Sequence, residues 1–239
     1  GGVILTRTAR WHRAPRWYTV AAHRPAFARP RQGLAACVGT RALGSTMERG
    51  LVSCEWLREE LDKGGEPIRL VDATWYLPNS PFAAPEGSGG AKAEYLAGPR
   101  LPGAVFFDID GVASTHPDGL AHMLPSEDMF AAAMAALQIE RTTRVVAYDR
   151  HGIFSSPRFW YTLKVAFDHP ADVAVLDGGL PRWKELGYPL EEGNLAAEVP
   201  VPAPMSSWSR RPDSAWALDR VRSNIEAREA LLLDARGAG

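Results

Sequence analysis

The sequence predicts an α/β fold, a doubly wound parallel sheet with helices on both faces. Short runs rich in Val, Ile and Leu alternate along the chain with longer stretches whose apolar residues recur at helical spacing. Because parallel strands need right-handed helical crossovers, this alternation places helices on both faces of the sheet. The 239 residues, 46% hydrophobic and 23% charged, are ordinary for a globular protein and by themselves indicate no function.

Four strands are predicted, at residues 68–72, 104–108, 144–149 and 172–177. Each is a short apolar run that ends at an aspartate. In open parallel sheets, ligands gather where the strands end, so the loops after these four strands are where a site is expected. An aspartate there suits a turn or a helix cap as readily as catalysis.

The helical stretches lie before and between these strands. Ser53 is predicted to cap the first helix, and Gly64 to end it. The Ala-rich residues 127–137 and the residues 157–167 predict two more helices. A Gly-Gly pair after the last strand allows a tight turn into a helix that carries Trp183.

The alternating pattern stops near residue 190 and then starts again. Residues 190–212 contain alternating prolines and are predicted to form an extended, semi-rigid linker. Residues 213–239 then repeat the order of residues 53–74, an amphipathic helix followed by a buried strand near 231–236. We therefore expect a first domain at 51–189 and the truncated start of a second copy at 213–239, ending before it can build a core.

The first 46 residues differ in charge from the rest of the chain. They contain eight arginines and no Asp, Glu or Lys, which is typical of a transit peptide, although a disordered basic leader fits as well. The predicted location is mitochondrial, with chloroplast or cytoplasmic as alternatives. The remaining residues are net acidic, which argues against a nucleic-acid partner. No apolar run approaches the roughly 18 residues of a membrane-spanning helix, so no membrane partner is expected.

Four motifs in order connect this chain to a known family. They are LPGAVFFDID at 101–110, HMLP at 122–125, GIFSSPR at 152–158 and LDGGLPRW at 176–183. Together they resemble the rhodanese superfamily, specifically the tandem-domain thiosulfate and 3-mercaptopyruvate sulfurtransferases. The resemblance implies a rhodanese-like fold for both copies. It also implies sulfur transfer from 3-mercaptopyruvate or thiosulfate, small-molecule donors, to a thiol or cyanide acceptor, with no cofactor and no metal.

In this family, a cysteine in a loop between a strand and a helix of the second domain takes up sulfur as a persulfide. Backbone N–H groups near a helix N-terminus stabilise such a thiolate, and an arginine pairs with the substrate carboxylate. The resemblance puts Asp149 at roughly the cysteine's position in the first domain. A carboxylate cannot carry sulfane sulfur, so residues 51–189 are expected to be a catalytically degenerate copy.

The resemblance therefore implies that this chain holds no catalytic residue and is inactive alone, the catalytic cysteine lying beyond Gly239. It implies a substrate-binding role for Arg236, the arginine of the Asp-Ala-Arg that opens the second domain. Thr74 holds the equivalent place in the first copy.

Three further points stay open. Arg100 replaces the histidine that related enzymes commonly have before Leu-Pro-Gly-Ala, and it is expected to be a solvated loop residue or, alternatively, an anion-binding one. Cys54 is expected to be a small, half-buried residue rather than a nucleophile. The alternative function is a stand-alone, non-catalytic rhodanese-like binding module whose Asp149 loop recognises an anion or a partner.

Overall fold

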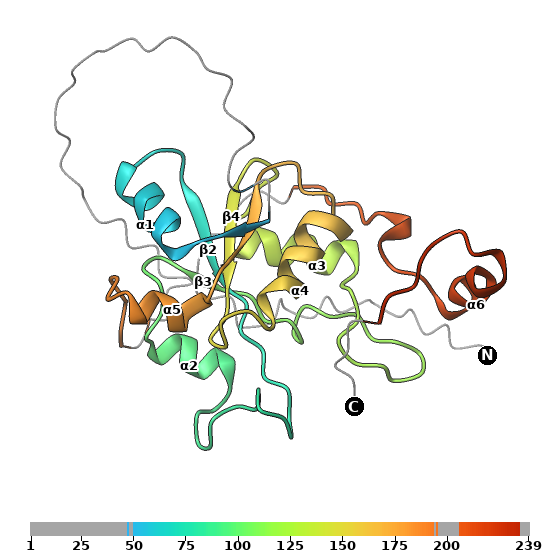
Figure 1. Cartoon of the computed structure of the whole chain (residues 1–239), viewed down its shortest axis with the longest axis horizontal. Coiled ribbons are helices and arrows are strands. Elements are labelled where there is room, and N and C mark those ends of the chain that lie inside the picture. Colours follow the sequence, from blue (N-terminus) through green and yellow to red (C-terminus); the bar gives the residue numbers. More distant parts are fainter. Residues whose placement is uncertain (1–46, 48–49, 194, 196–205, 235–239) are drawn as a thin grey trace, which may run out of the picture.

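A computed structural model describes residues 47, 50–193, 195 and 206–234 (Figure 1). The predicted leader at 1–46, most of the Pro-rich run and Arg236 lie outside these residues. Within the described ranges, no helix is both long enough and apolar enough to cross a bilayer.

One parallel sheet of five strands organises the described residues, in the order β1-β5-β4-β2-β3. The strands are β1 (Leu51–Val52), β2 (Ile68–Asp72), β3 (Val105–Phe106), β4 (Arg144–Tyr148) and β5 (Val173–Leu176). All four predicted strands are present, although β3, β4 and β5 are shorter than predicted. The unpredicted strand β1 adds to the edge by pairing with β5.

The strand register aligns the carboxyl ends of the central strands. Asp72 at the end of β2 lies opposite Tyr148 of β4 on one side and Phe106 of β3 on the other. The loops that follow these strands therefore leave the sheet at the same edge, as parallel topology requires.

Helices cover both faces of the sheet, because successive strand residues point to opposite sides. One face packs on α3 (Glu127–Ala136), α4 (Ser156–Trp160) and the π-helical turn that continues α4, η2 (Tyr161–Ala166). The other packs on α1 (Cys54–Lys63) and α5 (Gly179–Glu185), with α2 (Ala91–Ala97) beside α5 (Figure 1). The doubly wound prediction is confirmed.

Local signals set the helix boundaries. The Ser53 hydroxyl accepts a hydrogen bond from the N–H of Trp56 at 3.1 Å, and Gly64 closes α1 with a φ of 60°. Both boundaries are as predicted. The predicted helix at 157–167 becomes α4 and η2, and the helical connection expected between the strands at 68–72 and 104–108 is α2, whose bounds were not predicted.

Residues 206–212, the described part of the predicted linker, run back over the helices of one face of the sheet, beside α3 and η2. The side chain of Trp208 is only 3% exposed. Its ring lies edge-on to Phe130 at 5.2 Å and stacks on His169 at 5.6 Å, and the Arg141 guanidinium lies 4.9 Å from its centroid. This segment is therefore anchored to the helices that cover the sheet at Trp208.

The predicted helix of the second copy is present as α6 (Leu218–Ala227), but the strand predicted after it is not. Residues 231–234 have no regular structure, and Leu231 and Leu233 are 84% and 83% exposed. The prediction of a buried strand is wrong for these residues. A strand needs a neighbouring strand and an apolar surface to cover it, and the five-stranded sheet of the described residues does not extend to this segment.

Candidate functional site

The loops after β2 and β4 are joined at the carboxyl edge of the sheet. The N–H of Arg150 donates to the hydroxyl of Thr74 at 3.2 Å, and the N–H of Trp75 donates to the hydroxyl of Ser155 at 3.0 Å. The sequence predicted a site at this edge, and acidic, basic and hydroxyl side chains gather there.

The carboxylate of Asp149 is fully buried within its own loop. Oδ2 accepts hydrogen bonds from the N–H groups of Phe154, Ser155 and Ser156 at 2.8, 3.0 and 2.9 Å, and from the Ser156 hydroxyl at 2.7 Å. Oδ1 accepts from the N–H of His151 at 2.9 Å. These converging donors form a cradle for an anion, and the anion in it is the protein's own carboxylate.

Gly179 lets α5 approach this cradle from the other side. Its φ is +50°, and a Cβ added there would lie 2.4 Å from the Asp149 carbonyl oxygen and 2.7 Å from that of Gly152. Only glycine fits such a contact. The Gly-Gly pair is thus explained by backbone geometry, as the sequence predicted.

A buried charged cluster lies beside the cradle. Asp72 is fully buried and accepts two hydrogen bonds from Thr74, from its N–H and its hydroxyl. Arg150 Nε lies 3.8 Å from Asp72 Oδ2 and 3.9 Å from Glu94 Oε2. Burial raises the pKa of the Asp72 carboxyl above its ordinary value, although Arg150 opposes the shift.

Part of this cluster borders a cavity of about 440 Å³, which is lined by Tyr76, Glu94, Arg150, His151 and Lys184 among others. The Tyr76 hydroxyl donates to Glu94, and Arg150 Nη2 donates to the carbonyl oxygens of Glu94 and Pro99. Arg150 and Glu94 are therefore compensated by partners within the protein. The Asp149 cradle is filled by its own carboxylate, and the binding-module alternative stays a prediction.

A histidine–carboxylate pair lies on the same edge, near the protein surface. Nδ1 of His122 is 2.5 Å from Oδ1 of Asp110, and their side chains are 48% and 51% exposed. Nη2 of Arg158 donates to the main-chain oxygen of His122 at 2.7 Å. A carboxylate on Nδ1 orients the ring and leaves Nε2 to exchange a proton with a bound molecule.

Sequence reasoning missed this pair. Asp110 and His122 both stand inside motifs that identified the family, but 11 residues of loop separate them, and no periodicity links them. A signal was available, because both residues lie in the long loop that follows the strand predicted at 104–108. An acid and a histidine within one such loop can meet at the edge of the sheet.

Arg100 corrects another expectation. It is 3% exposed, neither a solvated residue nor one that faces an anion site. Its Nη1 donates to the carbonyl oxygens of Tyr95, Leu96 and Gly193 at 3.1 to 3.3 Å, and its Nε lies 3.4 Å from a Glu191 oxygen. Arg100 thus ties the end of α2 to the segment after α5.

Cys54 is a structural residue. It is 1% exposed, and its thiol donates to the Asp177 carbonyl oxygen at 3.4 Å. Burial, with the Glu55 carboxylate next in effect, raises the pKa of the thiol from 9.0 to about 11. Such a thiol is a poor nucleophile.

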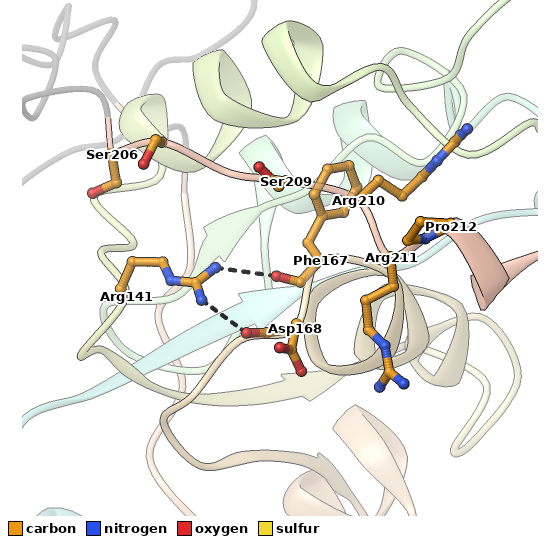
Figure 2. A pocket seen from close by; sticks show the side chains of 9 residues that line it. Arg141, Phe167, Asp168, Ser206, Ser209, Arg210, Arg211 and Pro212 are labelled. Atoms are coloured by element: carbon orange, nitrogen blue, oxygen red, sulfur yellow. Dashed lines mark hydrogen bonds between the residues drawn. The ribbon is translucent and has the colours of Figure 1, made fainter.

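A larger cavity, of about 710 Å³, lies where residues 206–212 pass over Arg141, Phe167 and Asp168 (Figure 2). Its arginines do not converge on one point. Arg141 donates to the carbonyl oxygens of Phe167 and Asp168 at 3.1 and 3.0 Å, while Arg210 and Arg211 point away from it in different directions (Figure 2). This cavity therefore has no arranged anion site. No group of three metal-ligating side chains occurs among the described residues.

Comparison with known proteins agrees with this fold. The family model of the rhodanese-like domain matches residues 53–186. The chain is 37% identical over 203 residues to thiosulfate/3-mercaptopyruvate sulfurtransferase 2 of Arabidopsis thaliana, covering 78% of this chain and 56% of that protein. It is 36% identical over 204 residues to the mitochondrial sulfurtransferase 1 of the same plant, covering 78% and 50%.

Among solved structures, SseA from Escherichia coli, described as a 3-mercaptopyruvate sulfotransferase, superposes with a TM-score of 0.64 and 29% identity. The match covers 79% of this chain and 66% of SseA. The chain thus spans about half the length of the curated relatives it matches.

Proposed function

The chain belongs to the rhodanese-like domain family, and from this premise we propose that it is the first domain of a longer sulfurtransferase. That protein moves sulfane sulfur from 3-mercaptopyruvate or thiosulfate to a thiol or cyanide acceptor. The observation that carries the proposal is the Asp149 carboxylate, which fills the loop where a sulfur-carrying cysteine would stand. The sulfur is therefore carried elsewhere, on a cysteine beyond Gly239.

The proposal also assigns a role to each of the other segments of the chain. Residues 190–212 link the domains, residues 213–239 begin the catalytic domain, and Arg236 pairs there with the substrate carboxylate. Residues 1–46 act as a mitochondrial transit peptide, a reading supported by their arginines and by the mitochondrial relative, with chloroplast or cytoplasmic location as alternatives.

The pair of His122 and Asp110 supports a proton-transfer role for the first domain. When the thiolate attacks the sulfur of 3-mercaptopyruvate, an S–S bond forms and the donor's C–S bond breaks, leaving its electron pair on an enolate. The donor thiol gives up one proton and the enolate carbon takes one up, so the products are pyruvate and a persulfide anion. Nε2 of His122 carries that proton between the two atoms.

Thiosulfate needs no such step. The thiolate attacks its outer sulfur, the S–S bond of thiosulfate breaks, and sulfite leaves with the electron pair without a proton transfer. His122 therefore serves the 3-mercaptopyruvate reaction in particular, because only that leaving group must be protonated.

The test compares the chain as far as Gly239 with the same protein extended by its native downstream sequence. The shorter chain is expected to form no thiocyanate from thiosulfate and cyanide, and the extended protein is expected to form it. Activity in the shorter chain that survives Cys54→Ala would overturn the proposal. So would an extended protein that transfers sulfur from neither donor.

A further inference from the structure

The geometry points to Trp75 as a positioning residue that holds the imidazole of His122 in one tautomer by fixing the carboxylate of Asp110. The inference concerns the arrangement of the pair and rests on the proposed function only for its effect on sulfur transfer.

Both carboxylate oxygens of Asp110 have a ring donor. Oδ1 meets Nδ1 of His122 at 2.5 Å, and Oδ2 accepts from the indole Nε1 of Trp75 at 2.7 Å. An exposed carboxylate bound at one oxygen alone rotates and exchanges its partner with water, which is why most surface pairs contribute little. The second bond removes that rotation, so Oδ1 stays directed at the imidazole.

The indole donor is itself held in place. The N–H of Trp75 donates to Ser155, which ties the residue to the loop after β4. The ring is partly buried against the core, lies nearly parallel to Phe154 at 6.2 Å, and meets the His122 ring edge-on at 4.9 Å and 72°. Because the ring touches His122 as well as Asp110, Trp75 constrains both members of the pair.

The backbone on either side of the pair is restrained too. His122 has a φ of 60°, and its carbonyl oxygen is held by Arg158. The N–H of Asp110 donates to Oδ1 of Asp108 at 3.1 Å. With both backbones held, the rotation of the Asp110 carboxylate is the freedom that remains, and Trp75 is the residue that restricts it.

A fixed carboxylate selects the tautomer of a neutral imidazole. The oxygen accepts from Nδ1, so the proton stays on Nδ1 and the lone pair stays on Nε2. No residue in the described part of the chain bonds to Nε2. The atom available to a substrate is therefore always in the same protonation form when the ring is neutral.

The test uses Trp75→Phe, which keeps an aromatic ring against His122 but lacks the N–H. Two-bond ¹H–¹⁵N spectra of the chain, recorded at a pH where histidines are neutral, distinguish the tautomers of each imidazole. The natural protein is expected to show His122 with the proton on Nδ1 only. Trp75→Phe is expected to shift His122 to a mixture with the Nε2-protonated form.

Trp208→Phe is the matched control, because it removes a buried indole N–H that has no acceptor among the residues the structure describes. It is expected to leave the His122 signals unchanged. If Trp75→Phe fails to fold, benzothienylalanine at position 75 replaces the N–H with sulfur and preserves the ring size. A His122 spectrum that is the same with and without the indole N–H would overturn the inference.

In the extended protein, Trp75→Phe is expected to lower kcat with 3-mercaptopyruvate at an unchanged KM. A failure of the proposed function gives a different result. The unaltered extended protein would then transfer no sulfur, while Trp75→Phe would still shift the tautomer of His122 in the spectrum.

Discussion

The hydroxyl and the main-chain N–H of Ser156 both donate to Oδ2 of Asp149, at 2.7 and 2.9 Å. Ser156 is the first residue of α4, so the carboxylate that ends β4 also holds the start of the following helix. One buried anion thereby sets the path of the whole loop, because each donor points inward to the same place.

Asp149→Ala is expected to lower the free energy of unfolding by roughly 3 kcal/mol, because several buried donors lose a charged acceptor at once. Urea unfolding measures the loss. Formate, which resembles the missing carboxylate, is expected to restore part of the stability in a concentration-dependent way.

Asp118→Ala is the control, since the Asp118 side chain is 83% exposed. It is expected to change stability by less than about 0.5 kcal/mol and to show no formate effect. Equal effects of formate on the two variants would show that the cradle does not bind the added anion.

His122→Asn in the extended protein is expected to lower turnover of 3-mercaptopyruvate by on the order of 10² to 10⁴-fold, the usual contribution of a general acid or base. Turnover of thiosulfate is expected to stay within a few-fold, because sulfite leaves without a proton. Steady-state assays with each donor measure the ratio. His116→Asn, another histidine of the same loop region, is the control, and a parallel loss with both donors would contradict the proton-transfer role.

Cys54 is expected to make the fold less stable at high pH. Its thiol has a pKa of about 11 when folded and about 9 when unfolded, so the unfolded chain loses the proton first as the pH rises. The stabilisation is complete below pH 9 and is lost between about pH 9 and pH 11. Urea unfolding measures the free energy of unfolding at about pH 8 and about pH 10.5. Between these two pH values it should fall by about 2 kcal/mol more in the natural protein than in Cys54→Ala. Identical pH dependence of the two proteins would refute the burial of this thiol.

Arg100→Met is expected to lower the free energy of unfolding by about 3 kcal/mol, because a buried guanidinium and its three hydrogen bonds to carbonyl oxygens, one of them on the buried Tyr95, are lost. Arg182→Met, at a side chain that is 43% exposed, is the control and is expected to cost less than about 1 kcal/mol. Thermal unfolding compares the two. Hydrogen exchange at the N–H of Arg100, which donates to Glu191, is expected to quicken only in the Arg100 variant.

Local chemistry explains which elements could be predicted. Helix α1 carries its own boundaries in Ser53 and Gly64, so its limits follow from the sequence. Strand β1 is two residues long and exists because Leu51 and Val52 pair with β5, more than 120 positions later. Such a strand has no periodic signal of its own.

In the candidate site, too, single residues could be identified from the sequence, but their contacts could not. Asp149 could be identified from its place after a strand, but the set of N–H groups around its carboxylate depends on how the loop closes. The contact of Asp110 with His122 depends on how the single loop between β3 and α3 folds back on itself, and on Trp75 from the loop after β2. Arg100 was expected in solvent because no property of the sequence shows that Gly193 returns to cover it.

The burial of Trp208 determines how far anything attached to this end of the chain can travel. A tether's reach is counted from its last fixed point, and here that point lies on the first domain itself, reinforced by the hydrogen bond from Tyr161 to the carbonyl oxygen of Ser214. The second domain that we propose, joined beyond this anchor, would be confined near the first at an effective concentration on the order of millimolar, the value expected for a short flexible linker. Docking of two such domains then requires little intrinsic affinity, because the search for the partner is already restricted to a small volume.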